Sequence, residues 1–225
     1  MSEKKIYVNS GNLPLIELIK NTPKLILDVG CGAGNNAELI RSRYPESIIE
    51  GVTYSEAERN IAVQAMNKVL VFDIEGDIPV EISSKKYDLL IFSHVLEHLR
   101  NPKIILQKFL ELLEDDGMVL IAVPNLLVWY MRLKFIFGEF NYEKEGILDD
   151  THLRFFTYFN IEDQLMGSIK DYKVTYKNVS GSIPLGPLRR YFLPNQITGL
   201  LDKIGCKYFP NLFGNQIIMV IKKIN

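Results

Sequence analysis

A glycine-rich turn at the end of an apolar run is the feature that most constrains the fold of this chain. The run Leu25–Val29 leads into Gly30-Cys31-Gly32-Ala33-Gly34, and helical sequence follows to Arg43. An apolar strand, a glycine turn and a helix in this order open a nucleotide-binding α/β sheet. The glycines permit a sharp turn and let a ligand approach where a Cβ atom would collide. The pattern therefore predicts a parallel α/β sheet with a ligand at its first loop.

Asp28 separates this loop from the dinucleotide-binding fingerprint. That fingerprint is G-x-G-x-x-G, and it presents a helix N-terminus to a pyrophosphate. Here the order is acid-x-G-x-G-x-G, and Asn35 stands where the last glycine of the fingerprint would be. A carboxylate repels a diphosphate and attracts a cation, so the loop is expected to bind a ligand that carries positive charge.

Apolar runs and helical sequence alternate along the chain, as in a parallel sheet with helices on both faces. The expected strands are Leu25–Val29, Ile48–Tyr54, Val69–Asp73, Leu89–Ser93, Met118–Val123, Asp171–Val179 and Gln216–Lys222. The expected helices are Asn12–Lys20, Asn35–Arg43, Ser55–Met66, Pro102–Leu113, Asn160–Lys170 and Asn195–Ile204. A turn at Asp115-Asp116-Gly117 is expected to lead into the fifth strand. Residues 126–157 are rich in aromatic side chains and show no strand pattern.

Composition fits one globular domain. The 225 residues are 47% hydrophobic and 24% charged, with a net charge of −1, which gives no basic face for nucleic acid.

No apolar segment follows the first five residues, so no signal peptide is expected. Arg132 and Lys134 interrupt the longest apolar stretch, so no stable membrane insertion is expected. Cys31 and Cys206 are expected to be free thiols in the cytoplasm. The oligomeric state is left open.

Two further motifs extend the pattern of the glycine loop. Tyr87–Leu99 (YDLLIFSHVLEHL) and Gly117–Asn125 (GMVLIAVPN) are similar to the fourth and fifth strands of class I S-adenosylmethionine-dependent methyltransferases, which residues 24–125 resemble. The resemblance implies a Rossmann-like, doubly wound, mostly parallel sheet of seven strands with one antiparallel strand. It also implies S-adenosyl-L-methionine as cofactor and S-adenosyl-L-homocysteine as product. The chain is then one domain, with a core at 24–125, a cap at 126–159 and a C-terminal part at 160–225 that contains an irregular insertion at 180–214.

The resemblance also implies the cofactor site. Asp28 is expected to act on the methionyl ammonium, Asp73 to accept from the adenine amino group, and Ile74 to contact the adenine. Asp73 has a second interpretation, because an aspartate after a strand also caps turns. The complete expected set is Asp28, Gly30, Gly32, Gly34, Tyr54, Asp73, Ile74, Ser93 and His94.

The second strand departs from the family pattern. Many relatives end this strand with an acid that accepts both ribose hydroxyls, whereas Thr53 stands at that position. A hydroxyl cannot replace a bidentate carboxylate. Tyr54 is expected to line the adenosine. Glu56 either reaches back as a substitute acid or is a solvated residue at the start of a helix.

Asp149–Thr157 (DDTHLRFFT) resembles a narrower branch of the family, common among bacterial genes for surface polysaccharides. His152 is the first candidate for a general base that takes the acceptor's proton, and His94 is the second. The pair Asp149-Asp150 is a candidate to orient His152. Alternatively, His152 and Arg154 tie the cap to the sheet. The expected substrate contacts are Asn125, Tyr130 and Arg154, the last to an anionic group.

His94-Val95-Leu96-Glu97-His98 matches a zinc-hydrolase pattern, H-x-x-E-H. That pattern needs both histidines on one continuous helical face. Here His94 ends a strand and His98 is expected to cap or pack, so no metal site is predicted. The expected activity is O-methylation of a sugar or a phosphate-containing glycan precursor of a surface polysaccharide. The alternatives are N- or C-methylation of another small molecule, and a methyltransferase fold that binds without catalysis.

Overall fold

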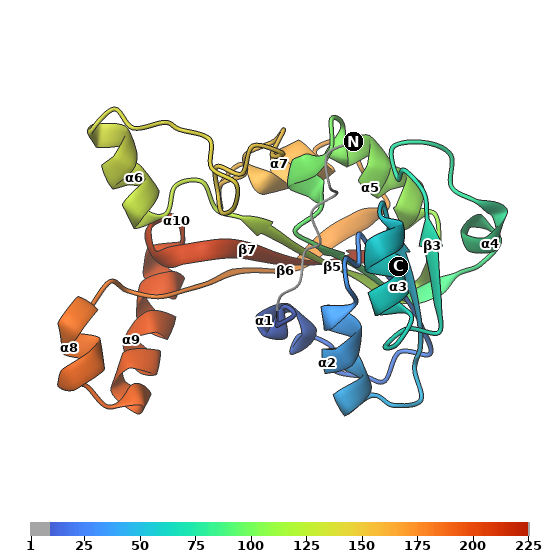
Figure 1. The fold of residues 1–225 in the computed structure, drawn as a ribbon, viewed down its shortest axis with the longest axis horizontal. Coiled ribbons are helices and arrows are strands. Elements are labelled where there is room, and N and C mark those ends of the chain that lie inside the picture. The colour runs from blue at the N-terminus through green and yellow to red at the C-terminus, as the bar shows by residue number, and fades with distance from the viewer. Residues whose placement is uncertain (1–9, 225) are drawn as a thin grey trace.

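The computed structural model describes residues 10–224, and these form a seven-stranded sheet with helices on both faces (Figure 1). The strands are β1 Leu25–Val29, β2 Ile48–Thr53, β3 Lys68–Val71, β4 Tyr87–Ser93, β5 Leu113–Pro124, β6 Tyr172–Gly181 and β7 Gly214–Lys223. Their order is β3-β2-β1-β4-β5-β7-β6. Among these strands, β7 runs antiparallel to both of its neighbours, β5 and β6, and the pairs β1–β2, β1–β4, β2–β3 and β4–β5 are parallel. The predicted α/β fold is confirmed.

The helices vary in length and cover the two faces of the sheet. They are α1 Leu13–Ile16, α2 Asn35–Arg43, α3 Glu56–Ala62, α4 Val80–Ser83, η1 Leu96–His98, α5 Pro102–Leu110, α6 Trp129–Ile136, α7 Ile161–Met166, α8 Gly186–Tyr191, α9 Asn195–Tyr208 and α10 Pro210–Phe213. In Figure 1, α5 and α7 lie above the sheet, and α1 and α2 lie below it. No helix within residues 10–224 is long and apolar enough to cross a membrane.

Two apolar clusters hold these layers together. On one face, Leu27 and Val29 of β1 pack with Leu106 and Phe109 of α5. On the other face, Ile26 of β1 packs with helices α1 and α2. Successive residues of a strand point to opposite faces, so both faces of β1 are covered by helices. A smaller cluster in the cap contains Val128, Met131, Ile147 and Leu148.

Several elements differ from the sequence expectation. The helix expected to reach Leu113 ends at Leu110, because β5 begins at Leu113. The expected turn at residues 115–117 lies inside β5: Tyr87 pairs with Leu113, and Leu89 pairs with Met118, so the intervening residues form a bulge. Helices α4, α8 and α10 were not predicted, because each has only four to six residues and carries little periodic signal. The segment used to predict the absence of a signal peptide lies outside the described residues.

Candidate active site

The glycine loop follows β1, which lies between β2 and β4 in the sheet; the chain continues from β1 to β2 on one side and later reaches β4 on the other. Strands β1 and β4 are parallel neighbours, so the loops after Val29 and Ser93 leave the same edge of the sheet. Gly30, Gly32 and Gly34 have φ angles of 74°, 51° and 87°, in the region that glycine adopts most readily. A Cβ atom on Gly30 would lie 2.3 Å from Cγ2 of Val95, so this residue must be glycine.

Asp28 is buried beneath this loop with only 1% of its surface exposed. Its Oδ2 accepts a hydrogen bond from Asn36 at 3.4 Å, and its Oδ1 has no hydrogen-bond partner within residues 10–224. Burial raises the pKa of Asp28 to about 7, against the lowering effect of the bond from Asn36. A buried carboxylate oxygen without a donor is costly. A cationic group of a ligand would stabilise it, so the residues here fit the ammonium-bearing cofactor that the sequence predicts.

Thr53 at the end of β2 is paired with an acid from the next helix. Its Oγ1 donates to Oε2 of Glu58 at 2.5 Å, and Glu58 is buried. Glu56 instead forms an exposed ion pair with Arg59 at 3.2 Å. The structure therefore favours the solvated alternative for Glu56 and brings a different acid, Glu58, to the end of β2. Tyr54 is 64% exposed at the same edge of the sheet.

Asp73 lies two residues beyond the end of β3. Its Oδ1 accepts a hydrogen bond from the backbone N–H of Glu75 at 2.9 Å, and its carbonyl accepts one from Gly76. These contacts form the turn-capping arrangement that was the second interpretation of the sequence. The side chain is exposed, and Ile74 packs partly against the core. The adenine role of Asp73 stays a prediction.

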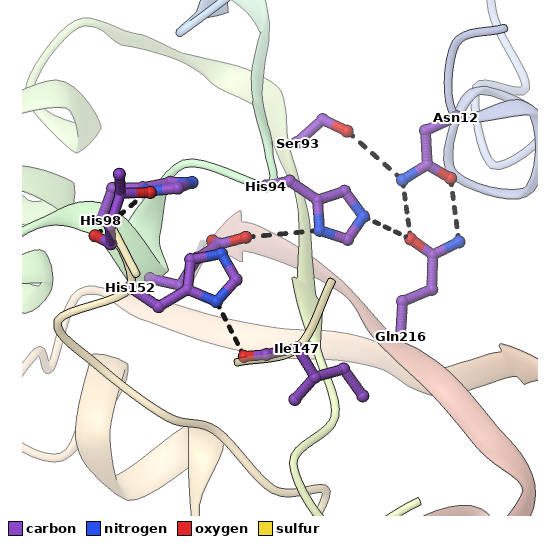
Figure 2. A network of polar contacts seen from close by, with 9 residues as sticks. Asn12, Ser93, His94, His98, Ile147, His152 and Gln216 are labelled. Atoms are coloured by element: carbon purple, nitrogen blue, oxygen red, sulfur yellow. Dashed lines mark hydrogen bonds and ion pairs between the residues drawn. The ribbon is translucent and has the colours of Figure 1, made fainter. Parts of the chain in front are cut away.

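His94 sits at the centre of a polar network just after β4 (Figure 2). Its backbone has a φ of 57°, which is uncommon for a residue with a side chain and marks a strained turn. Nδ1 lies 3.3 Å from Oε1 of Glu97, and Nε2 lies 2.9 Å from Oε1 of Gln216. Partial burial opposes a charge on the ring, but Glu97 and then Gln216 raise the pKa of His94 above its ordinary value. Nε2 contacts the amide oxygen of Gln216, and Nδ1 forms an ion pair with Glu97 when the ring is protonated.

The network continues from His94 to the glycine loop. Nδ2 of Asn12 donates to Oε1 of Gln216 at 2.8 Å and to Oγ of Ser93 at 3.3 Å. The backbone N–H of Asn12 donates to Asn36, the residue that contacts Asp28. Hydrogen bonds thus connect the first loop, β4 and β7, which lie far apart in the sequence.

His152 lies beside His98, with ring centroids 4.7 Å apart. Its Nδ1 contacts the carbonyl of Ile147 at 2.9 Å. This backbone oxygen therefore orients the ring, a role for which the sequence offered the pair Asp149-Asp150. His152 is 8% exposed. The backbone N–H groups of Leu153 and Arg154 both donate to the carbonyl of Glu97, which fixes the cap against η1.

The three expected substrate contacts differ in accessibility. Asn125 is fully buried, and its Nδ2 donates to the carbonyl of Gly214 at 2.8 Å, so its amide is used within the fold. Tyr130 is half-buried in α6 against Trp129. Arg154 is exposed, and its guanidinium donates to the carbonyl of Arg100.

A methyltransferase-domain family model matches residues 2–167. The chain belongs to the methyltransferase domain family. It is 24% identical over 99 residues to (S)-tetrahydroprotoberberine N-methyltransferase of Eschscholzia californica, covering 43% of this chain and 28% of that protein. It is 27% identical over 108 residues to malonyl-[acyl-carrier protein] O-methyltransferase of Halalkalibacterium halodurans, covering 46% and 40%. The chain thus spans less than half the length of these curated relatives.

The fold of this methyltransferase domain also occurs in solved structures. The plantazolicin methyltransferase BpumL in complex with SAH has a TM-score of 0.60 and 20% identity, covering 94% of this chain and 80% of that one. An O-methyltransferase of Brevibacillus brevis in complex with S-adenosyl-L-homocysteine has a TM-score of 0.56 and 17% identity, covering 93% and 70%.

Sequence reasoning missed four polar residues of this methyltransferase-domain site. Asn12 and Gln216 lie outside every motif, near the two ends of the chain, and no spacing rule connects them. Glu58 resembles an ordinary helical acid, although its position five residues after Thr53 is a usable signal in retrospect. Glu97 was seen only as part of a rejected zinc pattern.

Proposed function

We propose that this protein transfers a methyl group from S-adenosylmethionine to an acceptor oxygen. The observation that carries the proposal is the buried Asp28 oxygen without a donor, set under a glycine loop at the edge between β1 and β4. When bound, S-adenosylmethionine supplies a methyl carbon that bonds to the acceptor oxygen as the carbon–sulfur bond breaks, leaving neutral S-adenosylhomocysteine while the hydroxyl proton departs. The protein's contribution is to place the acceptor in line with the methyl group and to receive the proton.

The polar contacts of the ring nitrogens distinguish the two histidines that were candidates for the base. The Nδ1–H of His152 donates to Ile147, so in the neutral ring Nε2 carries a lone pair. In His94, Nε2 contacts the amide oxygen of Gln216 and Nδ1 faces the carboxylate of Glu97, so both nitrogens are already in polar contacts. We therefore place the acceptor hydroxyl at His152, with the cap of residues 126–159 forming the acceptor pocket.

We propose a sugar or a phosphate-containing glycan precursor of a surface polysaccharide as the acceptor. The resemblance of residues 149–157 to enzymes of that branch supports this class. Basic side chains also support it: Arg100, Lys103 and Arg154 line a surface hollow of about 640 Å³ beside the start of α5. Guanidinium and ammonium groups favour carboxylate or phosphate. The cytoplasm is the proposed compartment, since both described cysteines are buried thiols rather than a disulfide.

Calorimetry and a methylation assay test this function in two steps. Titration with S-adenosylmethionine and S-adenosylhomocysteine should show one site for each. Nucleotide sugars and phosphorylated sugars are then incubated with cofactor carrying a labelled methyl group, and the products are cleaved under conditions specific for methyl ethers or esters. Label on nitrogen or carbon would replace O-methylation with the first alternative. Cofactor binding without turnover on any acceptor class would favour a binding protein, and no cofactor binding would reject the proposal.

A further inference from the structure

Glu97, His98 and His152 form a compact cluster of side chains at the junction between η1 and the cap. Each offers one possible metal-binding atom, and these atoms all lie within 4.8 Å of one another. Two imidazoles and one carboxylate are a common ligand set for divalent transition metals in proteins. Ligand atoms about 2.1 Å from a tetrahedral zinc ion lie roughly 3.4 Å apart, so small rotamer shifts bring the three groups to one ion.

Glu97 supplies a charge that the fold does not neutralise by hydrogen bonding. Its side chain is 1% exposed, and neither carboxylate oxygen has a hydrogen-bond partner among the residues described. The contact from Nδ1 of His94 to Oε1 is an ion pair while that ring is protonated. A buried carboxylate needs a cation or several donors to offset its desolvation, and a metal ion at the other oxygen meets that need.

His98 has the tautomer that a metal ligand requires. The hydroxyl of Thr151 donates to Oδ1 of Asp149 at 2.6 Å, so its oxygen accepts from Nδ1–H of His98 at 3.0 Å. The carbonyl of Thr151 also faces this nitrogen, at 3.3 Å. Nε2 therefore carries the lone pair.

His152 is prepared in the same way by a different group. Its Nδ1–H donates to the carbonyl of Ile147, a contact that Figure 2 marks with a dashed line. Metal-binding histidines typically donate their second ring nitrogen to a carbonyl or a carboxylate-linked group, which fixes the ring and its tautomer. Both histidines of this cluster have such a support, His98 from Thr151 and His152 from Ile147.

We propose that Glu97, His98 and His152 bind one divalent transition-metal cation of the zinc class. Three protein ligands leave a coordination position for water or a substrate oxygen. This use of the open position rests on the proposed function: with the cation bound, Nε2 of His152 would be a metal ligand instead of the proton acceptor, and the cation would lower the pKa of an acceptor hydroxyl at the open position, whose proton would pass to water. The predicted absence of a metal site is revised accordingly, since His98 pairs with His152 rather than with His94.

The test measures metal binding directly on the full-length, metal-stripped protein with no affinity tag. Titration with Zn²⁺ against a chelating dye is expected to show one site with a dissociation constant below about 1 μM at pH 7.5. Co²⁺ should produce visible d–d absorption bands at one equivalent. Mg²⁺ should compete poorly, because it prefers oxygen ligands. Glu97→Gln and His152→Ala should each weaken Zn²⁺ binding by about 100-fold or more, and Thr151→Val by about 10- to 100-fold through His98.

Asp150→Asn is the matched control, an exposed acid next to the cluster, and it should leave Zn²⁺ affinity unchanged. Circular dichroism checks that each variant is folded, and if His152→Ala is not, Glu97→Gln and Thr151→Val decide. Substoichiometric binding, or affinity unchanged in the folded variants, overturns the metal site. S-adenosylhomocysteine titrations on the same samples keep the two proposals apart. Cofactor binding without zinc binding rejects only this inference, and zinc binding without cofactor binding rejects only the proposed function.

Discussion

Thr53 donates a 2.5 Å hydrogen bond to Glu58. An acid from α3 therefore lies at the end of β2, where the last residue of the strand is a threonine. We expect Glu58 to serve the cofactor ribose in place of the acid missing at position 53. Glu58→Ala should weaken the binding of S-adenosylhomocysteine by about 10- to 100-fold, which corresponds to the loss of one or two hydrogen bonds to a charged group. Glu56→Ala, in the same helical turn but exposed, is the control. Equal affinities in the two variants, measured by calorimetry, would assign Glu58 to structure alone.

Asp28 gives a pH dependence of cofactor binding. In the free protein its pKa is raised to about 7, whereas a bound cation favours the carboxylate. The affinity for S-adenosylhomocysteine should therefore fall as pH decreases below about 7, approaching tenfold per unit. Asp28→Asn should bind weakly at every pH and lose this slope. A wild-type affinity that stays constant from pH 5.5 to 8 would contradict this expectation.

The same carboxyl affects folding stability with the opposite sign from a salt-bridged aspartate. Its folded-state pKa of about 7 exceeds the ordinary value of 3.8, so its stabilising contribution is complete below pH 3.8 and is lost as pH rises through about 7. Without cofactor at pH 8, Asp28→Asn should therefore raise Tm by roughly 2–4 °C for each kcal/mol recovered. A lower Tm at pH 8 in thermal unfolding would show that the carboxylate is satisfied in the free protein.

Gly32→Val should abolish cofactor binding. A branched side chain at a φ of 51° is strained, and it would enter the space where the methionyl group is expected. Gly138→Val is the control for strain alone, because Gly138 has a φ of 75° and nothing lies within 4 Å of its ideal Cβ. Both variants should have a lower Tm than the wild type, but only Gly32→Val should fail to bind S-adenosylhomocysteine. Retained binding there would remove the basis of the cofactor site.

Asp73→Ala separates the adenine role from the turn seen in the structure. If the carboxylate accepts from adenine, the variant should bind cofactor more weakly by about 1–2 kcal/mol, or roughly 5- to 30-fold. Asp73→Asn keeps an acceptor for the N–H of Glu75 and should recover much of the stability. An unchanged dissociation constant together with a lower Tm would leave only the turn.

His152→Ala should lower turnover on an identified acceptor by roughly 10²–10⁴-fold. Because its contacts are with Ile147 of the cap and His98 of η1, and not with the glycine loop, S-adenosylhomocysteine affinity should change little. If His152 only anchors the cap, KM for the acceptor and Tm should both worsen while kcat at saturation is nearly retained. A stable variant with full kcat and KM would exclude both roles.

The sequence alone specified the sheet, its first loop and the family. Strands that are apolar on both faces, a glycine-rich turn and strand–helix alternation are patterns among residues close together in the sequence, so they can be recognised without the structure. The same locality explains the errors: four-residue helices and a bulge within β5 leave too short a pattern to identify.

The tertiary structure decided which polar groups meet. Glu58 rather than Glu56 lies against Thr53, and His98 contacts His152 rather than sharing a helical face with His94. Ile147 supplies the oxygen that orients His152, and Gln216 from β7 completes the contacts of His94. These partners come from distant segments, and their pairing depends on how the cap and β7 pack against the end of β4. Burial and donor geometry set the chemistry of each group, and both exist only after the chain has folded.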